Sequence, residues 1–131
     1  MNNKLDKILA EISAGELFDK ITILEIKKAK ISNKDKLTNI QKELNSLNKT
    51  IKKFIPNQEK TIELVNDLKK INLKLWDIED GKRSAEKNND FGEEFIKLAR
   101  NVYKFNDERA KIKLAINNAL GSNIKEVKSY D

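Results

Sequence analysis

The sequence contains no cysteine and no histidine, and only one proline and four glycines in 131 residues. Without cysteine there can be no disulfide and no thiolate site. Without histidine the chain lacks the commonest general base and the usual zinc ligand, so any metal would be a hard cation held by carboxylates. The scarcity of proline and glycine argues against a fold rich in tight β-turns, such as a sandwich or a barrel.

Long hydrophobic runs are also missing from the sequence. The first fifteen residues hold no apolar stretch long enough for a signal peptide. Nowhere does the chain approach the ~20 consecutive apolar residues of a membrane span. We therefore expect a cytoplasmic protein with no membrane span.

Charged and hydrophobic residues are present in nearly equal shares, 37% and 38%, and the formal net charge is +6. That balance is typical of long amphipathic helices, whose outer faces must be solvated. The length corresponds to one domain by the usual relation between chain length and domain count. We therefore expect a single helical domain over residues 1–131, with an all-α fold.

Cap and stop signals divide the chain into four predicted helices. Ser13, Ser32 and Asp90 each stand three residues before an acidic residue, a pattern that caps helix N-termini. Pro56 excludes the helical region for the residue before it, and Gly121 is placed to end a helix in the left-handed conformation. The predicted helices span roughly residues 13–31, 32–55, 57–86 and 90–120.

The second and third predicted helices carry apolar residues spaced alternately three and four apart, the pattern of a coiled-coil seam. We expect these two helices to form a long antiparallel hairpin within a helical bundle. The first helix is apolar on more than one side, so we expect neighbours or a second subunit to cover it, and hence a homo-oligomer. Residues 1–12 and 124–130 are also compatible with strands, which predicts a short terminal β ribbon.

Polar residues interrupt the apolar stripes of three predicted helices. Burying a charge costs several kcal/mol unless it is paired and hydrogen-bonded, so these side chains are expected to meet each other or a ligand. The cluster consists of Glu25, Asn72, Glu79, Arg83, Asn106, Arg109 and Lys113.

Three interpretations of this polar cluster stay open. In the first interpretation, the cluster is a self-paired network that sets helix register, with Glu79 and Arg83 as an i,i+4 ion pair. In the second interpretation, the cluster binds an anionic small molecule. Arg109 and Lys113 would hold its phosphate or carboxylate, and Asn72 and Asn106 would form hydrogen bonds with its hydroxyl or amide groups. The third interpretation is a subunit interface.

A Mg²⁺-dependent enzyme of nucleotide or sugar-phosphate chemistry is an alternative. Glu16, Asp19 and Asp80 are acidic residues at helical spacing, as in the carboxylate pairs that hold Mg²⁺ in all-helical nucleotide pyrophosphohydrolases. The sequence lacks the doubled Glu-Glu-x-x-Glu pattern of those enzymes. The expectation therefore leans away from an enzyme and from a cofactor.

Residues 20–60 form a strongly basic stretch, with eleven lysines against four acidic residues. Antiparallel helical arms of this charge can lie along an RNA or DNA backbone. Phe54 is the only aromatic residue of this stretch beyond the first helix, so few aromatic side chains are present on which nucleic-acid bases could stack. A solvated lysine-rich face is the simpler interpretation, and nucleic-acid binding is the alternative.

Four segments resemble a family of short bacterial proteins known only as a domain of unknown function. They are residues 12–31, 72–80, 95–113 and 121–130, including the patterns GELFDKITILEIK, LWDIED and NDER. The resemblance implies no mechanism and assigns no functional residues. The resemblance also implies a link to glycan assembly, which ranks sugar nucleotides ahead of free nucleotides as a ligand class. The leading hypothesis is a non-enzymatic binding or interaction module.

Overall fold

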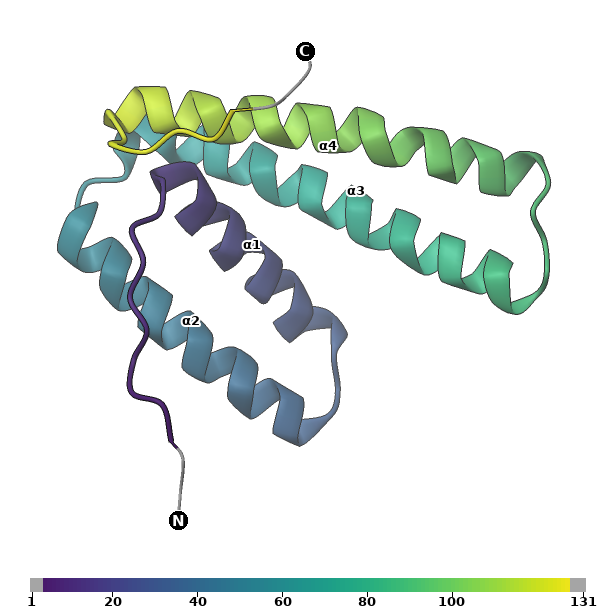
Figure 1. Ribbon diagram of the computed structural model, residues 1–131, viewed down its shortest axis with the longest axis horizontal. Coiled ribbons are helices and arrows are strands. Elements are labelled where there is room, and N and C mark those ends of the chain that lie inside the picture. Colours follow the sequence, from purple (N-terminus) through teal and green to yellow (C-terminus); the bar gives the residue numbers. More distant parts are fainter. Residues whose placement is uncertain (1–3, 128–131) are drawn as a thin grey trace.

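The computed structural model describes residues 4–127, which fold into four α-helices with no strand among them (Figure 1). The helices are α1 (Ala14–Lys30), α2 (Lys34–Phe54), α3 (Ile62–Lys87) and α4 (Glu93–Leu120). A single 3-10 turn, Glu59–Thr61, precedes α3. The prediction of an all-α helical bundle is confirmed.

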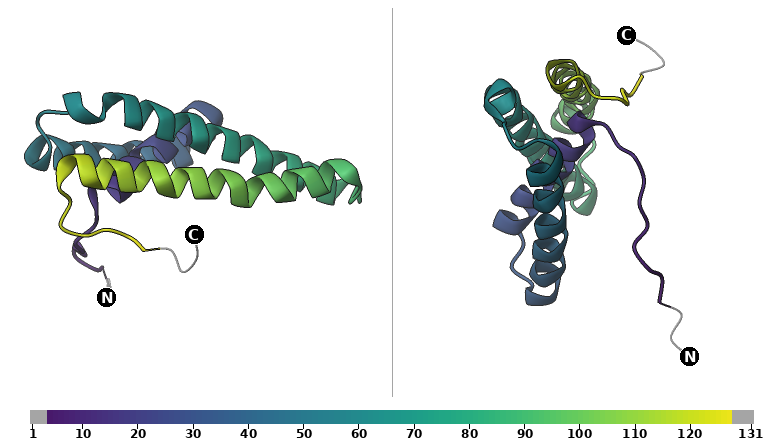
Figure 2. Two further views of the ribbon diagram at one scale, coloured as in Figure 1. Left: turned by 90° about the horizontal axis from the view of Figure 1, so that it is seen from above. Right: turned by 90° about the vertical axis from the view of Figure 1, so that its left-hand side faces the viewer.

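The helices form two antiparallel hairpins that cross each other (Figures 1 and 2). We call α1 and α2 the short hairpin, and α3 and α4 the long hairpin. Helix α1 lies at the centre and contacts each of the other three helices. The connected ends of α3 and α4 extend beyond the short hairpin, so this part of the long hairpin has no third layer over it.

The predicted pairing of the second and third helices is wrong. No Cα atom of α2 lies within 8 Å of one in α3, whereas α3 packs along α4. The seam of α2 is buried against α1 instead, through Ile40, Leu44 and Ile51. Seam spacing shows which face of a helix is covered but not which helix covers it, and here α1 separates the two candidates.

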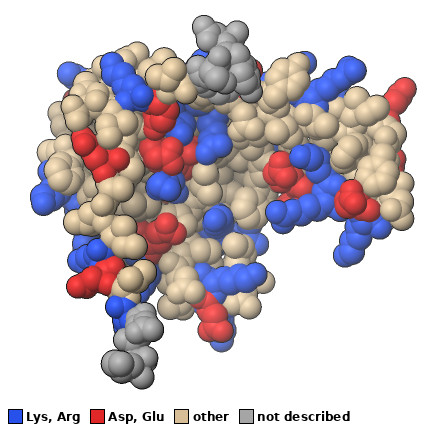
Figure 3. Space-filling view, viewed as in Figure 1, with Lys and Arg blue, Asp and Glu red and all other residues tan. Residues whose placement is uncertain are grey.

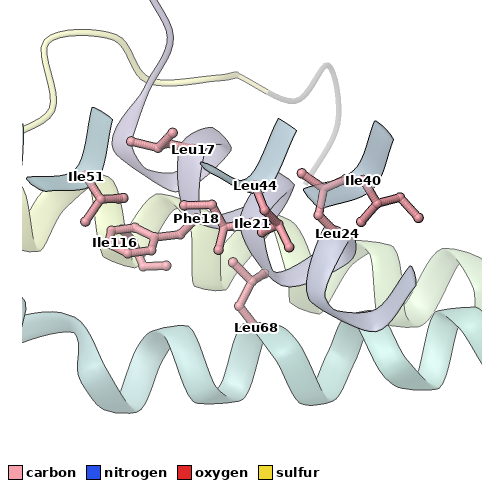
Figure 4. Close-up of a cluster of buried hydrophobic side chains, with 9 residues drawn as sticks. All are labelled: Leu17, Phe18, Ile21, Leu24, Ile40, Leu44, Ile51, Leu68 and Ile116. Carbon is pink, nitrogen blue, oxygen red and sulfur yellow. The ribbon is translucent and has the colours of Figure 1, made fainter. Parts of the chain in front are cut away.

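The hydrophobic core lies where the two hairpins cross (Figure 4). Helix α1 supplies its largest share, and Phe18 is only 3% exposed. Single residues from the long hairpin complete it, and both Leu68 and Ile116 are fully buried. The nine buried core residues are Leu17, Phe18, Ile21, Leu24, Ile40, Leu44, Ile51, Leu68 and Ile116.

A second buried face of α1 meets the long hairpin. Gly15, Asp19, Thr22 and Ile26 follow one another at spacings of four, three and four, and all are buried. A side chain at Gly15 would meet the backbone oxygen of Lys113 at 2.5 Å, so only glycine lets α1 approach α4 this closely. This close approach brings a polar stripe of α1 against polar residues of α3 and α4.

The helix ends agree with the predicted signals in part. The hydroxyl of Ser13 accepts a hydrogen bond from the Glu16 amide at 3.0 Å, as predicted, and α2 ends two residues before Pro56. Gly121 adopts the predicted left-handed conformation at the end of α4, with φ 63°. The cap of α2 is shifted by one residue, because the Asn33 side chain accepts from the Lys36 amide.

Helices α3 and α4 begin later than predicted. Helix α3 starts at Ile62 rather than near residue 57, since the 3-10 turn takes up the intervening residues. At α4, the N-cap residue is Gly92 rather than Asp90. The Asp90 carboxylate accepts from the Gly92 amide at 3.3 Å, so it orders the turn before the helix instead of capping it.

In the part that the structure describes, the terminal segments meet beside the start of α1 and then diverge, so they form no ribbon (Figures 1 and 2). The Asn123 amide donates to the Glu11 carboxylate at 2.5 Å, and the hydroxyl of Ser13 donates to Glu126. Both segments are irregular, and residues 128–130 of the predicted second strand lie outside the described range. Side-chain hydrogen bonds therefore join the ends where a strand ladder was expected.

Candidate functional site

Asp19 is the centre of a buried polar network between α1 and the long hairpin. Its side chain is only 1% exposed. One carboxylate oxygen accepts from Asn72 Nδ2 and from Arg109 Nε, both at 2.9 Å. The other oxygen accepts from Arg109 Nη2, so the guanidinium binds the carboxylate through two parallel hydrogen bonds.

Further side chains complete this network. Asn72 Nδ2 also donates to the hydroxyl of Thr22 at 3.0 Å, and that hydroxyl donates to the backbone oxygen of Asp19 at 2.9 Å. Lys113 Nζ lies 2.6 Å from a Glu16 oxygen and 3.9 Å from Asp19. We call these six residues the inner network: Glu16, Asp19, Thr22, Asn72, Arg109 and Lys113.

The inner network holds Asp19 in its ionised form. Burial alone would raise the pKa of Asp19. The hydrogen bonds from Arg109 and Asn72, together with the charges of Arg109 and Lys113, outweigh burial and leave that pKa below its ordinary value of 3.8. The hydrogen bond to Asp19 in turn raises the pKa of Arg109. A guanidinium and a carboxylate thus stabilise each other's charges between two hairpins.

The inner network is self-satisfied, and its acids are Glu16 and Asp19, which lay outside the predicted polar cluster. Among the described residues, no buried side-chain nitrogen or oxygen lacks a hydrogen-bond partner. Arg109 and Lys113 were predicted to hold an anionic ligand, but Asp19 and Glu16 already occupy them. These two cations therefore join the helices instead of offering free charges.

An open pocket lies beside the inner network, between α1, α3 and α4. It has a volume of about 400 Å³, within the size range of small-molecule sites. Its lining combines apolar side chains, among them Ile23, Leu75 and Trp76, with charged and amide side chains. The full lining is Ile23, Ile26, Lys27, Asn72, Leu75, Trp76, Glu79, Asp80, Arg83, Asn106 and Arg109.

The pocket brings together five of the seven residues of the predicted polar cluster. Asn72 and Arg109 form its boundary with the inner network, and Asn106 accepts from Arg109 Nη1 at 3.4 Å. Glu79 and Arg83 stand on the α3 wall, but Glu79 pairs with Lys82 at 3.5 Å and not with Arg83 as predicted. The five residues are Asn72, Glu79, Arg83, Asn106 and Arg109.

The other two predicted residues lie elsewhere. Placing Glu25 in the cluster was wrong, since its exposed side chain pairs with Lys69 on the surface at 3.8 Å. One residue position is 100° around a helix, and Ile26, not Glu25, lies on the buried face that Asp19 shares. Lys113 belongs to the inner network but does not line this pocket.

Sequence reasoning missed the central role of Asp19 and the contributions of Trp76 and Lys27 to the pocket. A usable signal was present, because Gly15, Asp19 and Thr22 share the four-three spacing of a buried face. A glycine on such a face indicates a close helix contact, and an aspartate four residues later then predicts a buried, paired carboxylate.

The carboxylates of the Mg²⁺ alternative do not gather into a metal site. Glu16 and Asp19 accept from Lys113 and Arg109, while Asp80 stands on the α3 wall of the pocket. Within residues 4–127, no group of three or more acidic, histidine or cysteine side chains is placed to hold a metal ion. The spacing of Glu16 and Asp19 suggested a pair of carboxylates that holds a metal ion. In the structure, the positive side chains of Lys113 and Arg109 bind these two carboxylates instead.

The basic stretch 20–60 folds as most of the short hairpin. Phe54, at the end of α2, is 69% exposed and lies 5.2 Å from the ammonium of Lys53. The surface of Figure 3 carries positive and negative side chains intermixed rather than one uniform basic face.

None of the helices in residues 4–127 has both the length and the apolar character that crossing a bilayer requires. No curated protein and no solved structure matches the chain. One family model matches residues 8–131, nearly the whole chain, and so confirms the predicted resemblance. The chain belongs to a family of unknown function, DUF6165.

Proposed function

We propose that the protein is a non-enzymatic binding module whose pocket takes a phosphorylated small molecule carrying a ring, such as a sugar nucleotide. One observation carries the proposal: two cations without a partner, Lys27 and Arg83, share an open pocket with Trp76. Neither cation makes an ion pair or side-chain hydrogen bond within the described part of the chain. An anion placed between them would satisfy both.

The wall chemistry supports a ligand with distinct charged, apolar and hydroxyl-bearing parts. Arg83 offers paired N–H donors in the geometry that phosphate accepts. Trp76 and Leu75 supply an apolar surface against which a ring can pack. Glu79 and Asp80 supply carboxylate acceptors for hydroxyl groups. A nucleotide or sugar nucleotide presents all three kinds of group, and a simple anion presents only the first.

The inner network supports the pocket by making one of its walls rigid. Asn72 is tied to Asp19 and Thr22 through its amino group, which leaves its carbonyl oxygen as an acceptor at the pocket wall. Arg109 is fixed by two hydrogen bonds to the same carboxylate. Side chains held in place before binding lose little conformational freedom when a ligand arrives.

The protonation state of Asp19 favours binding over catalysis. A general acid or base works best with a pKa near the operating pH. The pKa of Asp19 is instead held below its ordinary value by Arg109 and Asn72 against the effect of burial. Its oxygens are also occupied by donors, so this buried carboxylate is a structural anion and not a proton acceptor.

A thermal-shift panel tests the proposal, using nucleotides, sugar nucleotides, sugar phosphates and inorganic phosphate, each with and without Mg²⁺. A ligand at 100 times its Kd adds about 2.7 kcal/mol to the free energy of unfolding. In a chain of this size, that raises the Tm by roughly 5–15 °C. We expect the shift with ring-bearing phosphates, and a much smaller one with inorganic phosphate.

Two variants locate the binding. Arg83→Gln should abolish the ligand shift and leave the ligand-free Tm nearly unchanged, because Arg83 is exposed and unpaired. Arg100→Gln is the matched control, an exposed arginine of α4 outside the pocket. A full shift retained in Arg83→Gln would place the ligand elsewhere. A flat panel for the unmodified protein would leave the network as a purely structural feature.

A further inference from the structure

Helix α4 carries a second seam whose large apolar side chains are exposed in the part of the chain that the structure describes. Its residues are spaced three and four apart, as in a coiled coil. Three large members are exposed, Ile96 at 47%, Tyr103 at 58% and Leu114 at 42%. Small residues stand between them. We call the set Ile96, Ala99, Tyr103, Asn106, Ala110 and Leu114 the α4 seam.

Apart from Asn106, which also lines the pocket described above, this seam is distinct from the face of α4 that packs on α3 and α1. That inner face includes Leu98, which contacts Gly81, and the fully buried Ile116. On a helix of 3.6 residues per turn, the α4 seam lies about a third of a turn away from that face. Exposed large apolar residues repeated at this spacing are typical of a helix that packs against another helix.

We propose that the α4 seam is a homodimer interface in which the α4 helices of two copies pack antiparallel. The two-fold axis would pass beside Tyr103, which stands midway between Ile96 and Ala110. Each Ile96 would then lie opposite Ala110 of the partner copy. Such an isologous pairing needs only one self-complementary surface, which is the commonest arrangement in soluble oligomers.

A hollow at the C-terminal end of the seam, beside Ala110 and Leu114, supports this register. It measures about 340 Å³, and its apolar lining comes from Ala110, Leu114 and the 92% exposed Val127. The rest of its lining is polar or charged: Asn106, Arg109, Lys113 and Glu126. Ile96, 47% exposed, lies beside a different hollow of α4, whose other lining residues are all polar or charged. In the antiparallel register, the exposed Ile96 of one copy enters the hollow of the other, as a knob enters a hole.

Charge placement along α4 favours the antiparallel orientation. The first turn is acidic, with Glu93 and Glu94, while Lys111 is exposed toward the other end. Antiparallel packing brings the acidic turn of each copy near Lys111 of its partner. Glu93 and Lys111 lie on the same flank of the seam. Parallel packing would place Glu93 beside Glu93 of the second copy, and flanking charges of this kind set helix orientation.

Sedimentation from about 1 µM to about 1 mM tests the association over the weak-to-moderate range of Kd. We expect a species of twice the 15.1 kDa chain mass. Tyr103→Glu should shift the protein to the monomer, since it places two carboxylates near the two-fold axis. Leu73→Glu is the matched control, because Leu73 is 39% exposed in the middle of α3. A monomer throughout, or a dimer that survives Tyr103→Glu, would overturn the proposal.

Cysteine cross-linking tests the register, and the absence of native cysteine makes each introduced thiol unique. Tyr103→Cys should form a disulfide-linked dimer upon oxidation, and Leu73→Cys should not. Ile96→Cys should fail to cross-link to itself, because the two copies of residue 96 would lie about 21 Å apart along the helices. It should cross-link to Ala110→Cys when the two variants are mixed. Self-linking at all three seam positions would indicate parallel packing and reject the proposed dimer.

Discussion

Removing the guanidinium of Arg109 is the most informative perturbation of the inner network. Arg109→Met keeps a long side-chain stem but removes both hydrogen bonds to Asp19. The Asp19 carboxylate, 1% exposed, would then keep the hydrogen bond from Asn72 and the charge of Lys113 at 3.9 Å. A buried charge that loses its main partner must either remain uncompensated or take up a proton.

The expected cost follows from the burial of the pair. Breaking a buried ion pair by removing one partner typically costs about 3–5 kcal/mol. Arg109 is 29% exposed, and Lys113 retains some of the attraction, so we expect the lower end, about 3 kcal/mol. Asp19→Asn should cost less, about 1–3 kcal/mol, because the remaining guanidinium can reach solvent.

Urea unfolding of the two single variants and the double variant measures the coupling between these residues. We expect Asp19 and Arg109 to be coupled by about 1–3 kcal/mol. The matched control is the cycle between Glu79 and Arg109, which line the same pocket but form no ion pair within residues 4–127. That second cycle should give a coupling within about 0.5 kcal/mol of zero.

A small loss of stability in Arg109→Met would contradict the expected dependence of Asp19 on Arg109. If Arg109→Met lowers the free energy of unfolding by less than about 1 kcal/mol, the carboxylate is not buried and dependent on its partner as described. Equal coupling in both cycles would also contradict it, because Asp19 would then have no privileged role. Fluorescence of the single tryptophan, Trp76, provides a second unfolding probe that checks two-state behaviour.

Four further predictions follow, one from Asp19 and three from contacts outside the inner network. The pKa of Asp19 is lower in the folded protein than its ordinary 3.8, so the stability it contributes is present above that pH and is lost as the pH falls through the folded value. Urea titrations at pH 2–5 should therefore show a shallower acid loss in Asp19→Asn than in the unmodified protein. Gly15→Ala should destabilise by about 1–3 kcal/mol or more, since its Cβ would meet a backbone oxygen at 2.5 Å. Gly81→Ala should change the free energy of unfolding by no more than about 1 kcal/mol, because its neighbour at 3.1 Å is a flexible leucine side chain and alanine favours the helix. Thermal melts of the two glycine variants check this contrast. Ser13→Ala removes the cap of α1 and the hydrogen bond to Glu126, so calorimetry should show a loss of about 1–2 kcal/mol.

Local patterns in the sequence were enough to predict the helices and most of their ends. The Ser13 cap, the stop at Pro56 and the left-handed Gly121 are each determined by a few neighbouring residues, so they could be predicted without a partner helix. The seams of α2 and α3 were also visible as spacings. That polar side chains such as Asn72 and Arg109 belong to a buried face follows from the same periodicity.

Only the tertiary structure decided which faces meet. A seam records that a face is buried but carries no information about its partner, so α3 was assigned to α2 when it packs on α4 and α1. For the same reason, Arg109 and Lys113 were expected to be free for a ligand. Their occupation by Asp19 and Glu16 depends on the close approach that Gly15 allows. The division of the cluster into a closed network and an open pocket is therefore set by helix crossing, a long-range property that local sequence patterns do not encode.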